Sequence, residues 1–156
     1  MEAVTINIKR ANLIADMKVT SHSEATALAD PQERYLAELG SDKLELAHQC
    51  ITDAATEAGS VLRRFLTGFY GDETATDNYD TADIVYVLSV TARKAPGLAD
   101  ALAKAVHAYV VDSALDKYYV SVSRPDMAQR HRDRLASHLT VIDGLLHRRT
   151  SPTYTT

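Results

Sequence analysis

The chain has 156 residues, the length of one domain, and it can bury a core without help from disulfides or metals. It is 46% apolar and 24% charged, and no apolar run reaches the roughly 18 residues of a membrane-spanning helix. Its net charge of −4 argues against bulk electrostatic binding of nucleic acid. No secretory leader is visible, and the single cysteine, Cys50, indicates a reducing compartment.

The N-terminal quarter predicts one strand and several short helices. Residues 3–8 alternate apolar and polar side chains, so they favour a strand. A strand this short must pair with another strand or with a neighbouring subunit. Short helices should follow over residues 9–20 and 24–29. Asp30 and Pro31 then mark a third short helix, as its N-cap and its first helical residue.

The first long helix is predicted to begin at Ser41, whose side chain can accept free N–H groups of the first turn. Apolar residues at steps of three and four form one face of it: Leu44, Ala47, Ile51, Ala54, Ala58, Val61, Leu62 and Phe65. Gly68 is a natural C-terminal stop.

Residues 71–82 are polar and acidic and predict a loop. The next stretch, 83–91, contains IVYVLSV, whose β-branched and aromatic residues favour a strand. Thr81 could equally cap a helix at this point. We expect a strand, because residues 3–8 then have a partner.

Two further long helices fill the last third. Residues 97–120 are apolar nearly all round, which is typical of a central helix packed on several sides. Ser123 and Asp126 have the spacing of a capping box at the start of the last helix. Arg148 and Arg149 suit the negative C-terminal end of that helix.

The predicted fold class is therefore mainly α. We expect a bundle of three long helices with short N-terminal helices, and a minor two-stranded β element from residues 3–8 and 83–91. Residues 1–149 should form a single helical domain, and residues 150–156 a disordered tail.

The histidines and the cysteine do not predict catalysis. His131 and His138 lie seven residues apart, whereas two ligands of one metal ion on a helix usually lie three or four apart. We expect them to form interhelical hydrogen bonds instead. His48 and Cys50 point to different sides of a helix, so a nucleophile pair is disfavoured, and Cys50 should be buried. We predict no enzyme, no cofactor and no metal.

Charge is distributed unevenly along the chain, with arginines in the last helix and acidic residues at 72–83. The arginines predict either a solvated helix face or a contact with an acidic partner. The acidic stretch 72–83 could supply that contact from a neighbouring copy, in a head-to-tail arrangement. An excess of tyrosine, eight against two phenylalanines, also suits an interface. The interface candidates are Arg124, Arg130, Arg134, Asp77, Asp80 and Tyr79.

Two segments resemble a known family. The run ITDAATEAGSVLRRFLTGFY (Ile51–Tyr70), small residues before an aromatic end, resembles a segment of phage head–tail connector proteins. The proline-led helix APGLADALAKAVHAYVVDSALDKYY, followed by a helix ending in DGLLHRR, is similar to small neck proteins of Mu-like phages and prophages. The resemblance covers roughly Ser41–Arg149. Residues 1–40 and 83–91 depart from it.

The resemblance implies a structural virion-assembly protein, with copies in a ring of about twelve between portal and tail. Its partners would be itself and the portal and tail proteins, with no membrane and with nucleic acid only as DNA passing through the ring. It would be found in the cytoplasm of a bacterial host and, once assembled, in the virion neck. The alternative is a small helical nucleic-acid-binding or regulatory protein of a mobile element, with the arginine helix on DNA.

Overall fold

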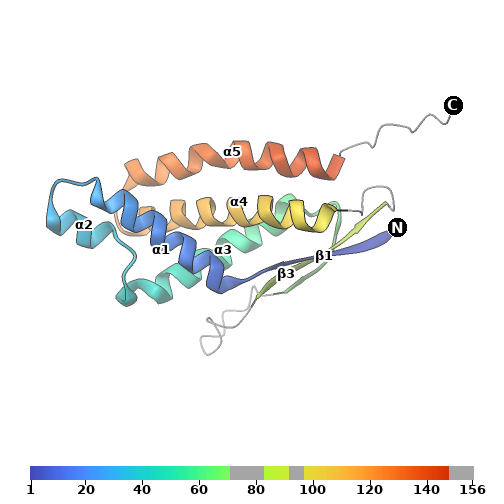
Figure 1. Cartoon of the computed structure of the whole chain (residues 1–156), viewed down its shortest axis with the longest axis horizontal. Helices are drawn as coiled ribbons and strands as arrows, with labels where there is room; N and C mark the ends of the chain where they lie inside the picture. Colours follow the sequence, from blue (N-terminus) through green and yellow to red (C-terminus); the bar gives the residue numbers. More distant parts are fainter. Residues whose placement is uncertain (71–82, 92–96, 148–156) are drawn as a thin grey trace.

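A computed structural model describes residues 1–70, 83–91 and 97–147. Figure 1 shows the long helices side by side, with a small sheet at one end of them. This architecture confirms the predicted fold class, mainly α with a minor β element. In chain order the elements are β1 (Glu2–Ile8), α1 (Arg10–Thr26), α2 (Pro31–Ala37), the 3-10 turn η1 (Ser41–Lys43), α3 (Leu44–Val61), β2 (Leu66–Tyr70), β3 (Ile84–Val90), α4 (Leu98–Ser121) and α5 (Pro125–His147).

The sheet has the strand order β1-β3-β2, and β3 is antiparallel to both neighbours. The pairing of β1 with β3 runs without interruption from Glu2 opposite Val90 to Ile8 opposite Ile84, which confirms the predicted partnership. Every second residue of β3 is buried, because one face of the sheet packs against the helices. Tyr86 belongs to that face and donates its hydroxyl to the carbonyl of Ala55 in α3.

The third strand, β2, was not predicted. The helix was expected to run on towards Gly68, but α3 ends at Val61 and the chain turns through residues 62–65 into the strand. Gly68 lies inside β2, where an added Cβ would be 3.4 Å from the ring of Tyr70. That distance is an ordinary van der Waals contact, and Gly68 lies at the register shift of β2 rather than at a helix end.

One long helix replaces the two short helices expected over residues 9–29. The polar run at residues 20–23 does not interrupt α1, because Ser21 is satisfied within the fold. Its hydroxyl donates to the carbonyl of Lys18 and accepts from the backbone N–H of Leu39. A buried serine with both partners is compatible with a helix interior.

The predicted start of α2 is confirmed, since Asp30 accepts the N–H of Gln32 at 2.9 Å and Pro31 is the first helical residue. The predicted start of the next helix is wrong. Ser41 opens the turn η1 and makes no capping bond. Lys43 instead closes the end of α2, donating its ammonium to three carbonyls, those of Tyr35, Leu36 and Glu38.

The central position predicted for residues 97–120 is confirmed, since α4 packs against α1, α3, α5 and β1. The helix α5 buries only one face, mainly against α4. The predicted capping box is wrong. Ser123 has a positive φ of 61° in the turn between the helices, and Arg124 supplies the carbonyl that accepts the first helical bond.

No helix among residues 1–70, 83–91 and 97–147 combines the length and the apolar character that a membrane crossing requires. The expected disordered tail, 150–156, lies outside the described residues.

Candidate functional site

Buried polar residues lie along the central helix α4, and Asp112, Ser113 and Asp116 are each at most 9% exposed. Asp112 and Ser113 belong to two separate networks, and Asp116 makes a separate contact with α5. The first joins α4 to α1 and α5, and the second joins α4 to α3.

His131 is the centre of the first network. This α5 residue has no exposed surface, and its ring nitrogens lie 2.7 Å from Asp112 of α4 and 2.6 Å from Glu24 of α1. Burial opposes a charge here, but the hydrogen bonds to Asp112 and Glu24 outweigh it and raise the pKa of His131 to about 9. The imidazolium therefore donates from both nitrogens and ties three helices together.

His138 approaches the same carboxylate, with its Nε2 2.5 Å from Asp112. Burial disfavours the charged form of Asp112, yet hydrogen bonds with His131 and His138 hold its pKa below the ordinary value. The prediction that these two histidines make interhelical hydrogen bonds is confirmed. Over the described parts of the chain, no group of histidine, cysteine and carboxylate residues has the arrangement of a metal site.

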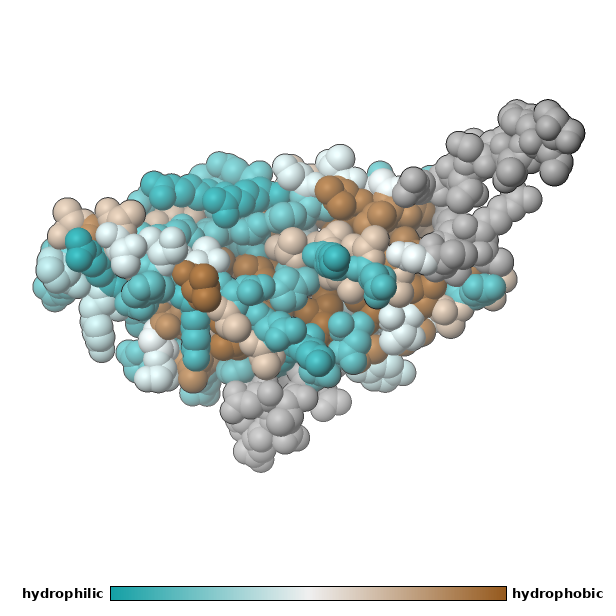
Figure 2. All heavy atoms as spheres, in the orientation of Figure 1, coloured by the Kyte–Doolittle hydropathy of each residue, from teal (hydrophilic) through white to brown (hydrophobic). Residues whose placement is uncertain are grey.

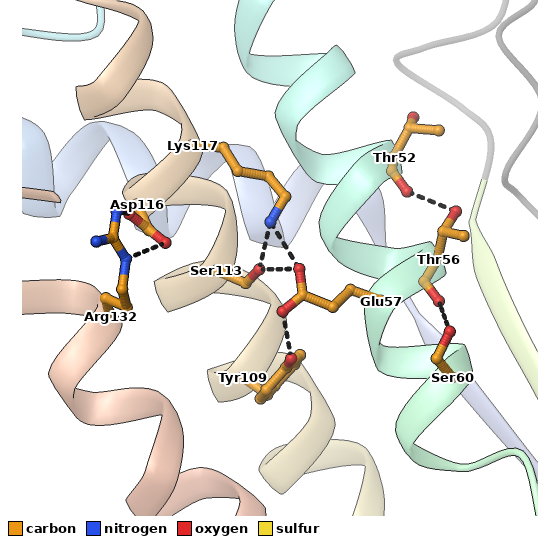
Figure 3. Close-up of polar contacts among 9 residues, drawn as sticks. All are labelled: Thr52, Thr56, Glu57, Ser60, Tyr109, Ser113, Asp116, Lys117 and Arg132. Carbon is orange, nitrogen blue, oxygen red and sulfur yellow. Dashed lines mark hydrogen bonds and ion pairs between the residues drawn. The ribbon is translucent and has the colours of Figure 1, made fainter. Parts of the chain in front are cut away.

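Glu57 of α3 is the centre of the second network, which Figure 3 shows from the side. Its carboxylate accepts hydrogen bonds from Tyr109 at 2.7 Å, Ser113 at 3.2 Å and Lys117 at 2.6 Å, all on α4. Burial opposes the charge, but these bonds lower the pKa of Glu57. On a neighbouring face of α4, Asp116 accepts two bonds from Arg132 of α5, at 2.9 and 3.2 Å (Figure 3).

Ser113 and Lys117 have the composition of a Ser–Lys nucleophile pair, since their side chains lie 3.2 Å apart. Ser113, however, has no exposed surface. Lys117 is ion-paired with Glu57, and a charged ammonium cannot act as a base. These hydrogen bonds therefore hold α3 against α4.

A shallow groove of about 320 Å³ runs between α1 and α4. His107 and Asp16 face each other in it, with ring nitrogen and carboxylate 2.5 Å apart. Its lining residues are Asp16, Val19, Thr20, His107, Ala108, Val111 and Asp112. The groove is thus lined by both polar and apolar side chains, and it borders the first network at Asp112.

The three arginine candidates lie in different environments. Arg124 is largely covered and pairs with Glu33 of α2 at 3.2 Å. Arg134 is 59% exposed and lies 3.8 Å from Asp112. Arg130 is exposed, and within the described residues it makes no ion pair. Arg130 and Arg134 are therefore open to a partner, whereas Arg124 is held within the chain.

The other three interface candidates, Asp77, Asp80 and Tyr79, lie outside the described residues. Their contact with the arginine helix stays a prediction. Figure 2 shows hydrophilic residues over much of α5, giving way to hydrophobic ones towards its C-terminal end. The exposed apolar residues Leu139 and Val141 belong to that half of the helix.

The sequence predicted the histidines of the first network but not their carboxylate partners, and it missed the second network, although α4 carried a signal. Tyr109, Ser113 and Lys117 recur every four residues, which places them on one face of a helix. Their partner Glu57 comes from a distant helix, so the spacing alone could not identify it. Comparisons with family models, curated proteins and solved structures found no match to this chain.

Proposed function

We propose that this chain is a structural virion-assembly protein, a head–tail connector subunit that forms a ring between the portal and the tail of a phage or prophage. One observation carries the proposal. The sheet has two outer strands, β1 and β2, and among the described residues neither has a partner on its outer side. The resemblance of roughly Ser41–Arg149 to phage neck proteins supports the same function.

A ring can be built from two unlike contact surfaces on each subunit, and the two sheet edges are such surfaces. In a head-to-tail contact, one surface of a subunit meets a different surface of the next, and the series closes when the rotation between copies is right. An unpaired strand edge is also a surface that readily binds another chain. The exposed face of α5, with Arg130 and Arg134, is a further surface for neighbouring copies or for portal and tail proteins.

Mass spectrometry and immunogold labelling of purified phage particles test this function. We expect the chain in stoichiometric amounts at the vertex that carries the tail, and portal, capsid and tail genes beside its gene. A chain absent from particles, with metabolic genes as its neighbours, would contradict the proposal.

The alternative is a DNA-binding or regulatory role for the arginine helix. Arg130 and Arg134 favour it, because both side chains are exposed on α5. Arg124 and Arg132 are occupied by ion pairs within the chain, which leaves few cations for phosphates. A gel shift with duplex DNA that weakens steeply with salt would favour this role over the connector.

A further inference from the structure

The strand β1 has one free backbone edge. On one side it pairs with β3 over all seven residues, and no described element pairs with the other side. The peptide N–H and C=O groups that point away from β3 can therefore receive another strand.

This edge carries none of the features that usually protect an edge strand. Natural edges are shielded by proline, by lysine or other charges, or by a bulge. From Ala3 to Ile8 the strand has none of these, and its register with β3 is regular. The exposed side chains between those ends, Ala3, Thr5 and Asn7, are small and neutral. The six residues Ala3–Ile8 therefore form an edge that is suited to strand addition.

The opposite edge, β2, leaves the apolar core incompletely covered. Leu66 and Phe69 face the helices, as their partners Leu88 and Tyr86 do, but both are only half-buried while those partners are fully buried. Tyr70 at the end of β2 is 62% exposed. A further strand with an apolar inner row would bury this remaining surface.

We propose that copies of this chain join by strand addition, with β1 of one copy parallel to β2 of the next. The inference rests on the proposed function, because it names the contact that would join subunits in the ring. Both strands are antiparallel to β3 and so run in the same direction. A neighbour that continues the sheet therefore presents its β2 parallel to β1, with the two apolar rows on the same side.

The charges at the strand starts fit this arrangement. Glu2 begins β1, and two exposed arginines, Arg63 and Arg64, lie two and three residues before the first residue of β2. Parallel strands place their starts at the same end, so Glu2 of one copy lies beside Arg63 and Arg64 of the next. Opposite charges across a contact fix its register and its partner. An antiparallel pair of two β1 strands would instead leave Leu66 and Phe69 uncovered.

Site-directed cross-linking identifies the contact. In a Cys50→Ala background, Thr5→Cys on β1 and Thr67→Cys on β2 are made separately, because the proposed register places these exposed residues side by side. They are treated with a short bis-maleimide at about 1 mM protein, where even a millimolar contact is populated. A mixture of the two variants should give a covalent dimer, and the double variant a ladder of larger species. A third variant, Thr140→Cys on the outer face of α5, should not cross-link to Thr67→Cys.

Two results overturn the contact. Covalent dimers of Thr5→Cys alone would show that two β1 strands pair with each other. The absence of any product between Thr5→Cys and Thr67→Cys would show that β1 of one copy does not lie beside β2 of the next.

Charge reversal provides an independent test. Glu2→Arg and Arg64→Glu should each weaken self-association by about three- to tenfold in sedimentation experiments, and a mixture or double variant should regain it. Lys18→Glu, exposed on α1, matches the charge change of Arg64→Glu and should leave association unchanged. Reversals without rescue contradict the proposed pairing.

The experiments distinguish an error in the proposed contact from an error in the proposed function. Chains found in the particle neck without the β1–β2 cross-link would retain the connector and remove this contact. Cross-linking by a chain that is absent from particles would retain the contact and remove the connector.

Discussion

His131 is a cation in a place that water does not reach. Its charge is compensated by Asp112 and Glu24, one from each neighbouring helix. A buried ion pair often contributes little compared with an apolar contact, but removal of one partner leaves an uncompensated charge and costs several kcal/mol. The attachment of α5 to α1 and α4 therefore depends on the protonation of His131.

The stability of the protein should fall as the pH rises through the pKa of His131. Its pKa is about 9 in the folded chain and about 6.5 in the unfolded chain, so its contribution is complete below pH 6.5 and lost above 9. We expect a loss on the order of 2 kcal/mol in the free energy of unfolding, measured by urea denaturation between about pH 6.5 and 9.5.

The variants His131→Gln and His22→Gln separate this residue from the other titrating groups. His131→Gln should be less stable at neutral pH by about 3 kcal/mol and should lack most of the alkaline decline. His22 lies on the surface of α1, and its variant should keep the decline. An identical decline in both variants would assign the effect to another group.

Ser123 is held in a left-handed conformation that a side chain disfavours. Ser123→Gly should raise the free energy of unfolding by about 1 kcal/mol, because glycine adopts this conformation without strain. Thermal and urea unfolding measure the effect. Ser137→Gly, within the exposed face of α5, should lower stability by about 0.5 kcal/mol. If both variants changed the free energy of unfolding in the same direction, strain at Ser123 would not explain the result.

Some residues were predictable because their partners lie nearby in the sequence. Asp30 and Pro31 mark a helix start through contacts within one turn, and the structure confirms them. Glu24, Asp112 and His131 are far apart in the chain, so spacing could not bring them together. The sequence predicted interhelical hydrogen bonds for His131, but the identity of its partners depends on tertiary packing.

At the scale of the elements, α4 holds the helices together through polar side chains as well as apolar ones. Tyr109, Ser113 and Lys117 all donate to the carboxylate of Glu57, so three donors of α4 converge on one group of α3. This link fixes the rotation of α3 about its axis, which apolar packing alone specifies less strictly.

Glu57→Gln should lower the free energy of unfolding at neutral pH by about 1 kcal/mol, a modest value because the side chain is 40% exposed. The folded pKa is lowered, so the contribution of the wild-type carboxylate is present above its ordinary pKa of 4.5 and lost as the pH falls through the folded value. Wild type and variant should therefore converge in acid.

Asp53→Asn is the matched control for this prediction, because Asp53 is exposed on the same helix. Urea unfolding at neutral and acidic pH should distinguish the two variants. A difference between wild type and Glu57→Gln that persists unchanged in acid would assign the effect to packing.

Helices were predicted better than the strand β2. The long apolar faces of α3, α4 and α5 repeat over several turns, whereas LTGFY offers five residues and a glycine that also suits a helix end. Gly68 is compatible both with a helix end and with a strand, so the sequence around it was ambiguous. Pairing with β3 makes this segment a strand. The continuity of α1 through a serine likewise depended on Leu39, distant in the chain.

At the scale of the whole molecule, α5 is the most exposed of the long helices, with Arg130 and Arg134 on its open surface. Charge reversal of both should weaken assembly, raising the concentration needed for half-association by about tenfold in sedimentation experiments. Arg130→Glu alone should show part of the effect. Unchanged assembly would rule out this face as a subunit contact.

A double variant of Lys18→Glu and Lys104→Glu matches the charge change of that reversal at other exposed positions. It should assemble as wild type does. Thermal melting of each variant establishes that the monomer stays folded, which matters because Arg134 lies 3.8 Å from Asp112.

Because β1 is the first element of the chain and pairs with the distant strand β3, it lacks a partner during part of its synthesis. Thr5 pairs with Val87, so β1 leaves the ribosome roughly 80 residues ahead of its partner. At about 5–20 residues per second, that gap lasts roughly 4–16 s. During this time Val4, Ile6 and Ile8 have no sheet to join. We expect the nascent chain to be a chaperone client until β3 emerges, and variants that slow translation between the two strands to yield more aggregate.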